Sequence, residues 1–236
     1  MTDPTERKPK LRPHLVAPPR LGEGSGGVAL LLHGGRENSR QGVTPFQLPV
    51  LRMIPFGWAI RRLRPDLTVA RLQFRLRGWN GECASPVADA LWALDEIQDR
   101  YGRVPVVLVG HSMGGRTAMR AAAHPSVLGM VGLAPWLPGT EPVDGLAGKD
   151  LVVLHGTRDH TTSASASLAF TERAAGIARQ SVYVQVARSG HTMLRRARRW
   201  HRLTAAYVAA MLDDAPLREV VPDATQRRDS ITVARV

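Results

Sequence analysis

The stretch Val106-Val107-Leu108-Val109-Gly110-His111-Ser112-Met113-Gly114-Gly115 decides the fold of this chain. An apolar, β-branched run ends in Gly-x-Ser-x-Gly, and residues 116–123 follow with the small side chains of a helix. This order predicts a strand, a very tight turn and a helix. The turn is expected to strain the backbone of Ser112 and to lift its hydroxyl clear of the sheet edge. Glycine is expected at 110 and 114 because a Cβ there would collide with a neighbouring strand or helix.

A serine in such a turn is a candidate nucleophile. The helix starts directly behind Ser112, so its free N–H groups and positive dipole end face any oxyanion formed there. The alternative is an ordinary serine in a Gly-rich loop, since Gly-x-Ser-x-Gly is short enough to occur by chance. The strand before Ser112 and the helix after it favour the nucleophile.

Length, composition and cysteine content indicate one soluble domain. The 236 residues suffice for a substantial core, and 44% hydrophobic with 22% charged residues is ordinary for a globular protein. No apolar run reaches the roughly 18 residues of a membrane-spanning helix. Residues 1–20 are charged and Pro-rich, unlike a secretory signal, so a cytoplasmic location is expected. Cys83 is the only cysteine, which excludes an intrachain disulfide.

The chain is strongly basic, with a formal charge of +12 and a pI near 11.2. Such a balance can reflect contact with nucleic acid, anionic lipid or acidic substrates. The arginines are spread along the chain, however, and no nucleic-acid motif accompanies them. We therefore interpret the charge as the arginine- and alanine-rich composition of a GC-rich genome. No nucleic-acid partner is expected, and peripheral contact with anionic surfaces is left open.

Strand patterns alternate with helix patterns along residues 21–213, between a flexible lead-in at 1–20 and a polar tail at 214–236. Apolar strand runs occupy residues 28–35, 67–74, 106–111, 128–136, 151–159 and 181–186. Helix patterns occupy residues 45–63, interrupted by Pro49 and Pro55, and 86–101, 113–124, 163–179 and 193–212. This alternation predicts an α/β fold: a three-layer, doubly wound, mainly parallel sheet of about six strands.

Three residues with complementary chemistry follow three of these strands: Ser112, Asp159 and His191. The carboxyl ends of parallel strands lie on one edge of a sheet, so the three side chains are expected to meet there. A serine hydroxyl is a weak nucleophile and needs an imidazole to take its proton. A carboxylate must orient that imidazole and stabilise its charged form. The chain order Ser, Asp, His is the order described for α/β-hydrolases.

Each partner also has a simpler explanation. Asp159 alone could cap the following helix, and His191 alone could be a loop histidine. Asp144 is a rival acid one strand earlier, although its Pro- and Gly-rich loop is less well placed. A metal site of His155, Asp159 and His160 is another alternative, without any other ligand cluster at metal spacing to support it.

A second Gly-rich strand end, His33-Gly34-Gly35, provides the expected oxyanion donors. Glycines there let the backbone approach a substrate carbonyl closely. The N–H group of Gly35 or Arg36 is expected to act together with that of Met113. His33 is interpreted as structural, with its ring hydrogen-bonded to loop backbone.

Two further loops bear on the mouth of the site. Arg75, Arg77 and Trp79 follow a strand at the same edge and could line the mouth, although solvated charges and a packed tryptophan also explain them. The loop at 137–149 is short and rich in Pro and Gly. It cannot hold a helical cap, so the site is expected to be shallow and open.

From about Val28 to Leu212 the chain resembles the α/β-hydrolase family. The resemblance rests on four motifs: Gly110-His111-Ser112-Met113-Gly114-Gly115, His33-Gly34-Gly35, His155-Gly156-Thr157-Arg158-Asp159 and Gly190-His191. It implies Ser112 as nucleophile, Asp159 as acid, His191 as base and an oxyanion hole of Met113 with Gly35 or Arg36. It implies no metal or organic cofactor. The short segment before Val28 departs from the family's usual first antiparallel strands.

These features predict a serine hydrolase that cleaves a carboxylic ester or thioester through an acyl-enzyme. The missing lid favours small or exposed acyl groups on a small-molecule substrate. Acyl transfer or peptide hydrolysis on the same triad is an alternative. A non-catalytic basic binding protein on the same scaffold is a further alternative, supported by the charge and by arginines on the last helix. Fold alone does not identify the substrate.

Overall fold

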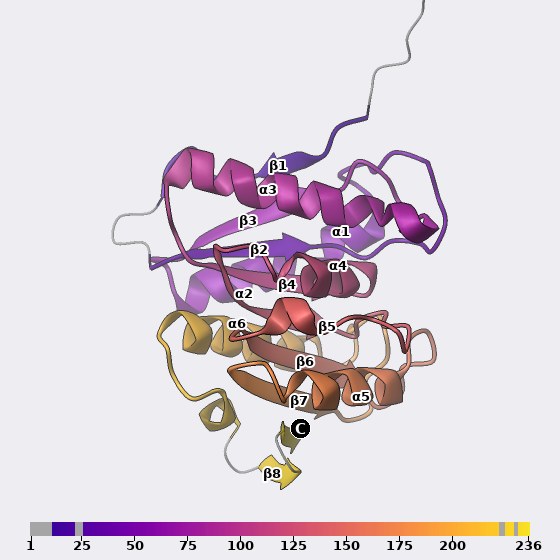
Figure 1. Ribbon diagram of the computed structural model, residues 1–236, viewed down its shortest axis with the longest axis vertical. Helices are drawn as coiled ribbons and strands as arrows, with labels where there is room; N and C mark the ends of the chain where they lie inside the picture. Colours follow the sequence, from indigo (N-terminus) through magenta and orange to yellow (C-terminus); the bar gives the residue numbers. More distant parts are fainter. Residues whose placement is uncertain (1–10, 22–25, 222–224, 229–230) are drawn as a thin grey trace, which may run out of the picture.

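One sheet with helices on both faces forms the body of the molecule (Figure 1). The computed structural model describes residues 11–21, 26–221, 225–228 and 231–236. Its strands are β1 (His14–Val16), β2 (Val28–Leu32), β3 (Thr68–Gln73), β4 (Val106–His111), β5 (Val127–Leu133), β6 (Asp150–Gly156), β7 (Gln180–Val186), β8 (Thr225–Arg228) and β9 (Ile231–Arg235). Their order across the sheet is β1-β3-β2-β4-β5-β6-β7-β9-β8.

The six predicted strands are the central ones, β2 to β7, and the predicted α/β fold class is confirmed. All six are parallel, with Leu32 of β2 opposite Gly110 of β4, and Gly110 opposite Gly132 of β5. Every residue of β2, β4 and β6 is buried. Strands covered by helices on both faces read as continuous apolar runs, which is why their positions were predictable. Their carboxyl ends share one edge of the sheet.

The sheet is larger than the predicted six strands. β1 lies in the predicted lead-in and pairs antiparallel with β3, whereas β9 lies in the predicted tail and pairs parallel with β7. β8 pairs antiparallel with β9. The segments predicted as a flexible lead-in and a polar tail therefore contribute strands that the prediction of about six did not include. Each is short, and β1 buries only Leu15, so backbone pairing stabilises it without an apolar run that the sequence would reveal.

The helices form the outer two layers (Figure 1). One face of the sheet packs against α2 (Ile54–Leu63) and α6 (Ala197–Leu212), with the short α1 (Leu48–Arg52) leading into α2. The other face packs against α3 (Ser85–Tyr101), α4 (Met113–Ala121) and α5 (Ala164–Ala174). Short 3-10 turns are η1 (Gly81–Cys83), η2 (Asp144–Leu146) and η3 (Leu217–Val220). In the described part of the chain, no helix has the length and hydropathy to cross a membrane.

Two helix predictions can be compared with the structure in detail. The interrupted pattern at 45–63 is a broken helix, as predicted, with Met53 between α1 and α2. The last helix begins at Ala197, four residues later than predicted. Met193 and Arg196 adopt positive φ angles of 58° and 62°, so residues 191–196 form a turn rather than helix.

Candidate active site

The turn at Ser112 has the predicted strained geometry. Ser112 joins β4 to α4 with φ 54° and ψ −117°, a backbone conformation that residues other than glycine rarely adopt. A Cβ on Gly110 would lie 2.2 Å from the carbonyl oxygen of Gly114, and one on Gly114 would lie 2.3 Å from that of Leu32. The two glycines therefore allow strand and helix to come close enough to form the turn.

The loop after β2 lies directly against this turn. A Cβ on Gly34 would be 3.4 Å from the Cβ of Ser112, and one on Gly35 would be 2.4 Å from the Cε of Met113. Both glycines therefore belong to a close backbone approach beside the serine hydroxyl. This is the arrangement that an oxyanion hole requires.

Hydrogen bonds distinguish the two candidate donors in this loop. The N–H group of Arg36 already donates to the carbonyl oxygen of Arg77, at 2.8 Å, so Arg36 cannot serve as the oxyanion donor. The N–H groups of Gly35 and Met113 make no hydrogen bond within the described part of the chain. Of the two alternatives, Gly35 is therefore the one that is free to act.

His33 orients the peptide that carries the Gly35 N–H group. Its Nδ1 donates to the carbonyl oxygen of Gly34 at 2.7 Å, and its Nε2 accepts from the N–H group of Phe74 at 3.2 Å. Since C=O and N–H point in opposite directions in a trans peptide, this bond directs the Gly35 N–H away from His33. Burial lowers the pKa of His33 to about 4, so the ring is neutral, as its one donated and one accepted bond require.

Asp159 and His191 are brought together as predicted from their strand ends. His191 Nδ1 lies 2.9 Å from Asp159 Oδ2. The same carboxylate receives bonds from the Thr162 hydroxyl, from His155 Nε2 and from the N–H groups of Thr161 and Thr162. Burial alone would raise the pKa of Asp159, but hydrogen bonds from His155, His191 and the two N–H groups outweigh it and hold that pKa far below its usual range. Asp159 is therefore a carboxylate at every physiological pH.

His191 lies beside the residue that precedes the serine. The rings of His111 and His191 are 4.8 Å apart between centroids, and His111 Nε2 donates to the carbonyl oxygen of His191 at 3.1 Å. Among the described residues, Ser112 Oγ makes no hydrogen bond with His191. Catalytic hydrogen bonds are often long in unliganded enzymes and shorten when substrate binds. Asp159 contacts Nδ1 of His191, so the other ring nitrogen, Nε2, is not engaged by this carboxylate.

Two features hold the loop that carries His191. A Cβ on Gly156 would lie 2.3 Å from the carbonyl oxygen of Ser189, so glycine at the end of β6 lets the two loops approach. The Ser189 hydroxyl donates to the carbonyl oxygen of Arg195 and accepts from the indole N–H of Trp200 in α6, at 2.9 and 2.8 Å. The loop is thus tied to the interior on both sides of His191.

The alternative assignments do not fit this geometry. Asp144 is exposed in η2 and makes no bond with His191 within the described residues. His155 donates to Asp159, and its other ring nitrogen contacts the Ser167 hydroxyl at 2.9 Å. No group of three or more His, Cys, Asp or Glu side chains suited to a metal ion occurs in the described ranges, so nothing supports a site that includes His160.

A family model for the alpha/beta hydrolase family matches residues 29–236, which include the serine turn, the Gly-rich loop and the Asp159–His191 pair. The chain belongs to the alpha/beta hydrolase family. No curated protein matches the sequence.

Several solved structures share the fold of this chain. Est1E from Butyrivibrio proteoclasticus, with bound ferulic acid, superposes with a TM-score of 0.63 at 11% identity, over 85% of this chain and 96% of that one. An esterase from Pyrococcus furiosus gives 0.59 at 18% identity, over 81% and 83%. A protein of unknown function from Agrobacterium tumefaciens gives 0.64 at 17% identity, over 85% and 91%. At these identities the likeness establishes the fold.

The remaining predicted loop residues of this alpha/beta hydrolase have structural contacts. Arg75 pairs with Asp89 at 3.1 Å, and the side chain of Arg77 donates to Gln41 at 2.8 Å. Trp79 is buried, and the guanidinium carbon of Arg116 lies 3.9 Å from the centroid of its ring. Packing and local pairing therefore account for the three, although Trp79 also lines the groove described next.

Sequence reasoning missed a groove beside the oxyanion loop. Arg116 stacks between Trp79 and Trp136, and these three side chains line an open groove of about 850 Å³ together with Glu37 and Arg120. The N–H group of Trp136 donates to the carbonyl oxygen of Ser112 at 3.1 Å, which places the groove next to the serine turn. No motif in the sequence pairs two tryptophans 57 residues apart with one arginine, so no signal pointed to it.

Proposed function

We propose that this alpha/beta hydrolase cleaves a carboxylic ester or thioester through a covalent acyl-enzyme on Ser112. One observation carries the proposal: the strained turn at Ser112 lies against the Gly34–Gly35 loop and its unbonded N–H group, while His191, hydrogen-bonded to Asp159, packs on His111, the residue before the serine. Together these are the parts that acyl transfer by serine requires.

In the first half of the reaction, Ser112 Oγ attacks the acyl carbon while His191 Nε2 takes the hydroxyl proton. The negative charge that develops on the carbonyl oxygen is stabilised by the N–H groups of Gly35 and Met113. Asp159 stabilises the imidazolium through Nδ1. The tetrahedral intermediate then breaks its carbon–oxygen or carbon–sulfur bond, and His191 gives its proton to the departing alcohol or thiol.

In the second half, the acyl group on Ser112 is removed by water. His191 Nε2 takes a proton from the water as its oxygen attacks the acyl carbon, and the same oxyanion hole receives the charge. Collapse of this intermediate releases the carboxylic acid and returns the proton to Ser112 Oγ. Asp159 stays ionised throughout, which agrees with the low pKa that its hydrogen bonds impose.

The open approach to Ser112 supports small or exposed acyl groups. Residues 137–149, where a cap would be inserted, contain only the three-residue turn η2. The groove beside the serine turn gives a substrate the indole ring of Trp136 and the guanidinium group of Arg116. A small or exposed acyl group can bind in such a groove without the enclosed chamber that a long acyl chain requires.

The test is activity-based labelling combined with ester hydrolysis. Ser112→Ala is expected to lose labelling by a fluorophosphonate probe and to lose turnover of p-nitrophenyl acetate. Ser165→Ala, which changes an exposed serine on α5, is the matched control and should retain both. Labelling or turnover that persists in Ser112→Ala would overturn the proposal. A panel of p-nitrophenyl esters of increasing chain length then defines the acyl group, with the shortest expected to react fastest.

A further inference from the structure

The positive charge of the protein is concentrated in two segments that contain no acidic residue. Residues 38–65 and 188–212 hold 11 of the 32 Lys and Arg residues and none of the 20 Asp and Glu residues. The rest of the chain has 21 basic against 20 acidic residues and is nearly neutral. The arginines are spread along the sequence, but the acidic residues that would balance them are missing from these segments.

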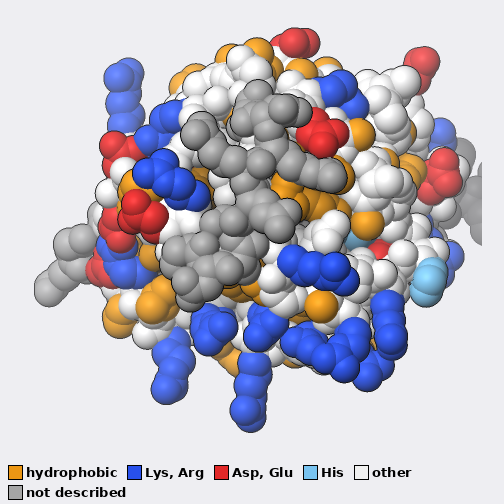
Figure 2. All heavy atoms as spheres, turned by 90° about the horizontal axis from the view of Figure 1, so that it is seen from below, with side chains coloured by type: hydrophobic (Ala, Val, Ile, Leu, Met, Phe, Trp, Pro, Cys, Tyr) orange, Lys and Arg blue, Asp and Glu red, His pale blue; other side chains and the backbone are white. Residues whose placement is uncertain are grey.

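The two segments lie side by side in the structure. They contain α1, α2 and α6, and α2 and α6 pack on the same face of the sheet (Figure 1). Phe56 of α2 contacts His201 of α6 edge to face, with ring centroids 4.6 Å apart. The exposed side chains of residues 38–65 and 188–212 therefore form one surface, which we call the arginine face. Seen from below, Lys and Arg side chains gather along one side of the molecule, while Asp and Glu lie elsewhere (Figure 2).

Internal ion pairs leave this charge uncompensated. Within the described residues, only Arg64 of the 11 arginines has an acidic partner, and it pairs with Asp66 and Asp213 at one end of the surface. Arg198 and Arg202 of α6 and Arg61 of α2 are exposed without such a partner. A surface of like charges that no internal carboxylate neutralises attracts anions from solution.

The arginine face is also unusually apolar for a charged surface. Of the 11 large hydrophobic side chains that are exposed in the described chain, six lie in these two segments: Phe46, Leu48, Leu51, Trp58, Leu63 and Leu194. Phe46, Leu48 and Leu194 are each more than 70% exposed. Clusters of exposed large apolar side chains mark interaction sites rather than inert surface.

We propose that the arginine face docks the protein on an anionic lipid surface. Arginines bind lipid phosphates while Trp, Phe and Leu side chains enter the boundary between headgroups and acyl chains, and this composition has both. A nucleic acid would satisfy the arginines but leave Phe46, Leu48 and Leu194 without an apolar partner. A second copy of the chain would place 11 arginines against 11 others.

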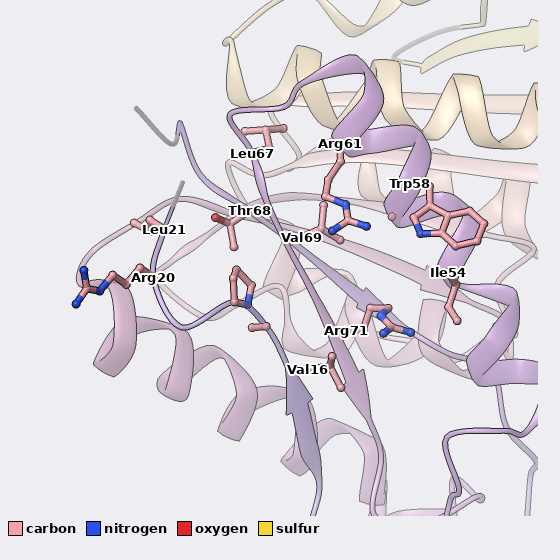
Figure 3. Close-up of a pocket in the computed structure, with 13 residues that line it drawn as sticks. Val16, Arg20, Leu21, Ile54, Trp58, Arg61, Leu67, Thr68, Val69 and Arg71 are labelled. Atoms are coloured by element: carbon pink, nitrogen blue, oxygen red, sulfur yellow. The ribbon is translucent and has the colours of Figure 1, made fainter. Parts of the chain in front are cut away.

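A groove along α2 extends this surface toward the edge of the sheet. Trp58 and Arg61 leave α2 above β3, and Arg71 rises from β3 below them (Figure 3). The groove measures about 530 Å³, and none of its lining residues is acidic. It gives one phosphate headgroup two guanidinium groups and an indole ring, which is more than a flat charged surface provides.

Docking in this way places the membrane close to the active site. Leu194 follows His191 by three residues, and the hydrophobic cluster under this face includes both Met193 and Met53, the residue between α1 and α2. The rim of the site near His191 is therefore part of the same surface. The lipid proposal does not depend on hydrolysis, because it concerns binding alone.

The test is co-sedimentation of the full chain with vesicles of phosphatidylcholine, with or without phosphatidylglycerol. Ser112→Ala protein is used, so that binding is measured without turnover. We expect binding to the anionic vesicles only, weakening as salt rises. Trp58 fluorescence should shift to shorter wavelength on binding, and Trp58→Phe should remove that part of the shift.

Matched charge reversals locate the binding surface. Arg198→Glu with Arg202→Glu is expected to weaken vesicle binding at least tenfold, since each basic residue at an anionic membrane contributes substantially to affinity. Arg100→Glu with Arg103→Glu makes the same change in net charge at the exposed end of α3 and should leave binding within about twofold. Equal loss in both variants, binding to duplex DNA but not to vesicles, or self-association without lipid would each overturn the proposal.

Discussion

At the residue scale, the site depends on glycines at which a Cβ atom would clash with neighbouring atoms. Gly35 is the clearest case, because a Cβ there would meet the Met113 side chain at 2.4 Å and the carbonyl oxygen of Arg77 at 2.5 Å. Arg77 is held in turn by the N–H group of Arg36. The loop therefore cannot accommodate a Cβ at position 35 unless the Gly35 N–H group moves.

Gly35→Ala is expected to lower kcat for a p-nitrophenyl ester by about 100-fold, the usual effect of losing one oxyanion donor. The fluorophosphonate probe should still label Ser112, more slowly, because the nucleophile and base are unchanged. Gly176→Ala is the matched control, since its Cβ would meet nothing within 4 Å. Full kcat in Gly35→Ala would show that this N–H group does not contact the reacting oxygen.

The residues predicted from sequence are those whose chemistry leaves a local pattern. Ser112 stands in a Gly-framed turn, and Asp159 and His191 follow apolar strands, so the sequence alone indicates each of them as a candidate. His111 and Thr162 could not, because their contacts with His191 and Asp159 depend on how separate loops meet. The sequence likewise does not distinguish Gly35 from Arg36, because the distinction depends on the hydrogen bond from the Arg36 N–H group to Arg77.

At the element scale, the loop between β7 and α6 is the part that positions His191, the proposed base. Trp200 in the first turn of α6 is fully buried and donates to the Ser189 hydroxyl, two residues before His191. That hydroxyl donates in turn to the carbonyl oxygen of Arg195. A helix residue thus fixes the loop on both sides of the imidazole.

Trp200→Phe is expected to reduce the free energy of unfolding by about 2 kcal/mol, from one lost hydrogen bond and a smaller buried ring. At temperatures where the variant is folded, kcat should fall several-fold because His191 is less well held. Trp92→Phe, a change on α3 at the other face of the sheet, should leave kcat unchanged. Loss of stability with wild-type kcat would mean that the loop keeps its position without Trp200.

The positions of strands that are buried on both faces of the sheet can be predicted from the sequence, whereas those of the other elements are harder to predict. The central strands appear in the sequence as apolar runs, and the proline-interrupted pattern correctly indicated two helices in place of one. The start of α6 was placed too early because residues 193–196 look helical by composition. Their turn depends on positive φ angles at Met193 and Arg196, which no side-chain pattern reports.

At the scale of the whole molecule, two buried neutral histidines make stability depend on pH. Burial lowers the pKa of His33 to about 4 and that of His111 to about 3. In the unfolded chain each ring takes up a proton near pH 6.5. Below that pH the unfolded state therefore binds more protons than the folded state, and stability falls as pH falls.

Between pH 7 and pH 5 each of these histidines is expected to cost about 2 kcal/mol of unfolding free energy. Urea unfolding at the two pH values measures the sum. His111→Gln, which keeps a donor but cannot titrate, should remove about half of the loss. His14→Gln, at an exposed position on β1, should remove none. If His111→Gln loses as much unfolding free energy between pH 7 and pH 5 as the wild type, another group must take up the proton.

The distribution of charge over the surface is a property of the whole molecule. Counting arginines along the chain suggests a uniform bias, and that reading overlooks where acidic residues are missing. Acidic residues are missing from two separate segments of the sequence, and these segments form one surface because α2 and α6, some 140 residues apart in the chain, lie on one face of the sheet (Figure 1). Strands β1 and β9 escaped prediction for a related reason, since their partners β3 and β7 lie far away in sequence.

The short connection through η2 has a consequence for the size of what the enzyme can process. Since residues 137–149 contain only a three-residue 3-10 turn, we expect no cap in that loop that would have to swing aside for entry or close before bond breaking. An acyl group tethered to a bead, a polymer or another macromolecule should therefore reach Ser112 as readily as a freely diffusing one. We therefore expect the enzyme to select substrates by the few atoms around the scissile bond and to tolerate bulky groups beyond them.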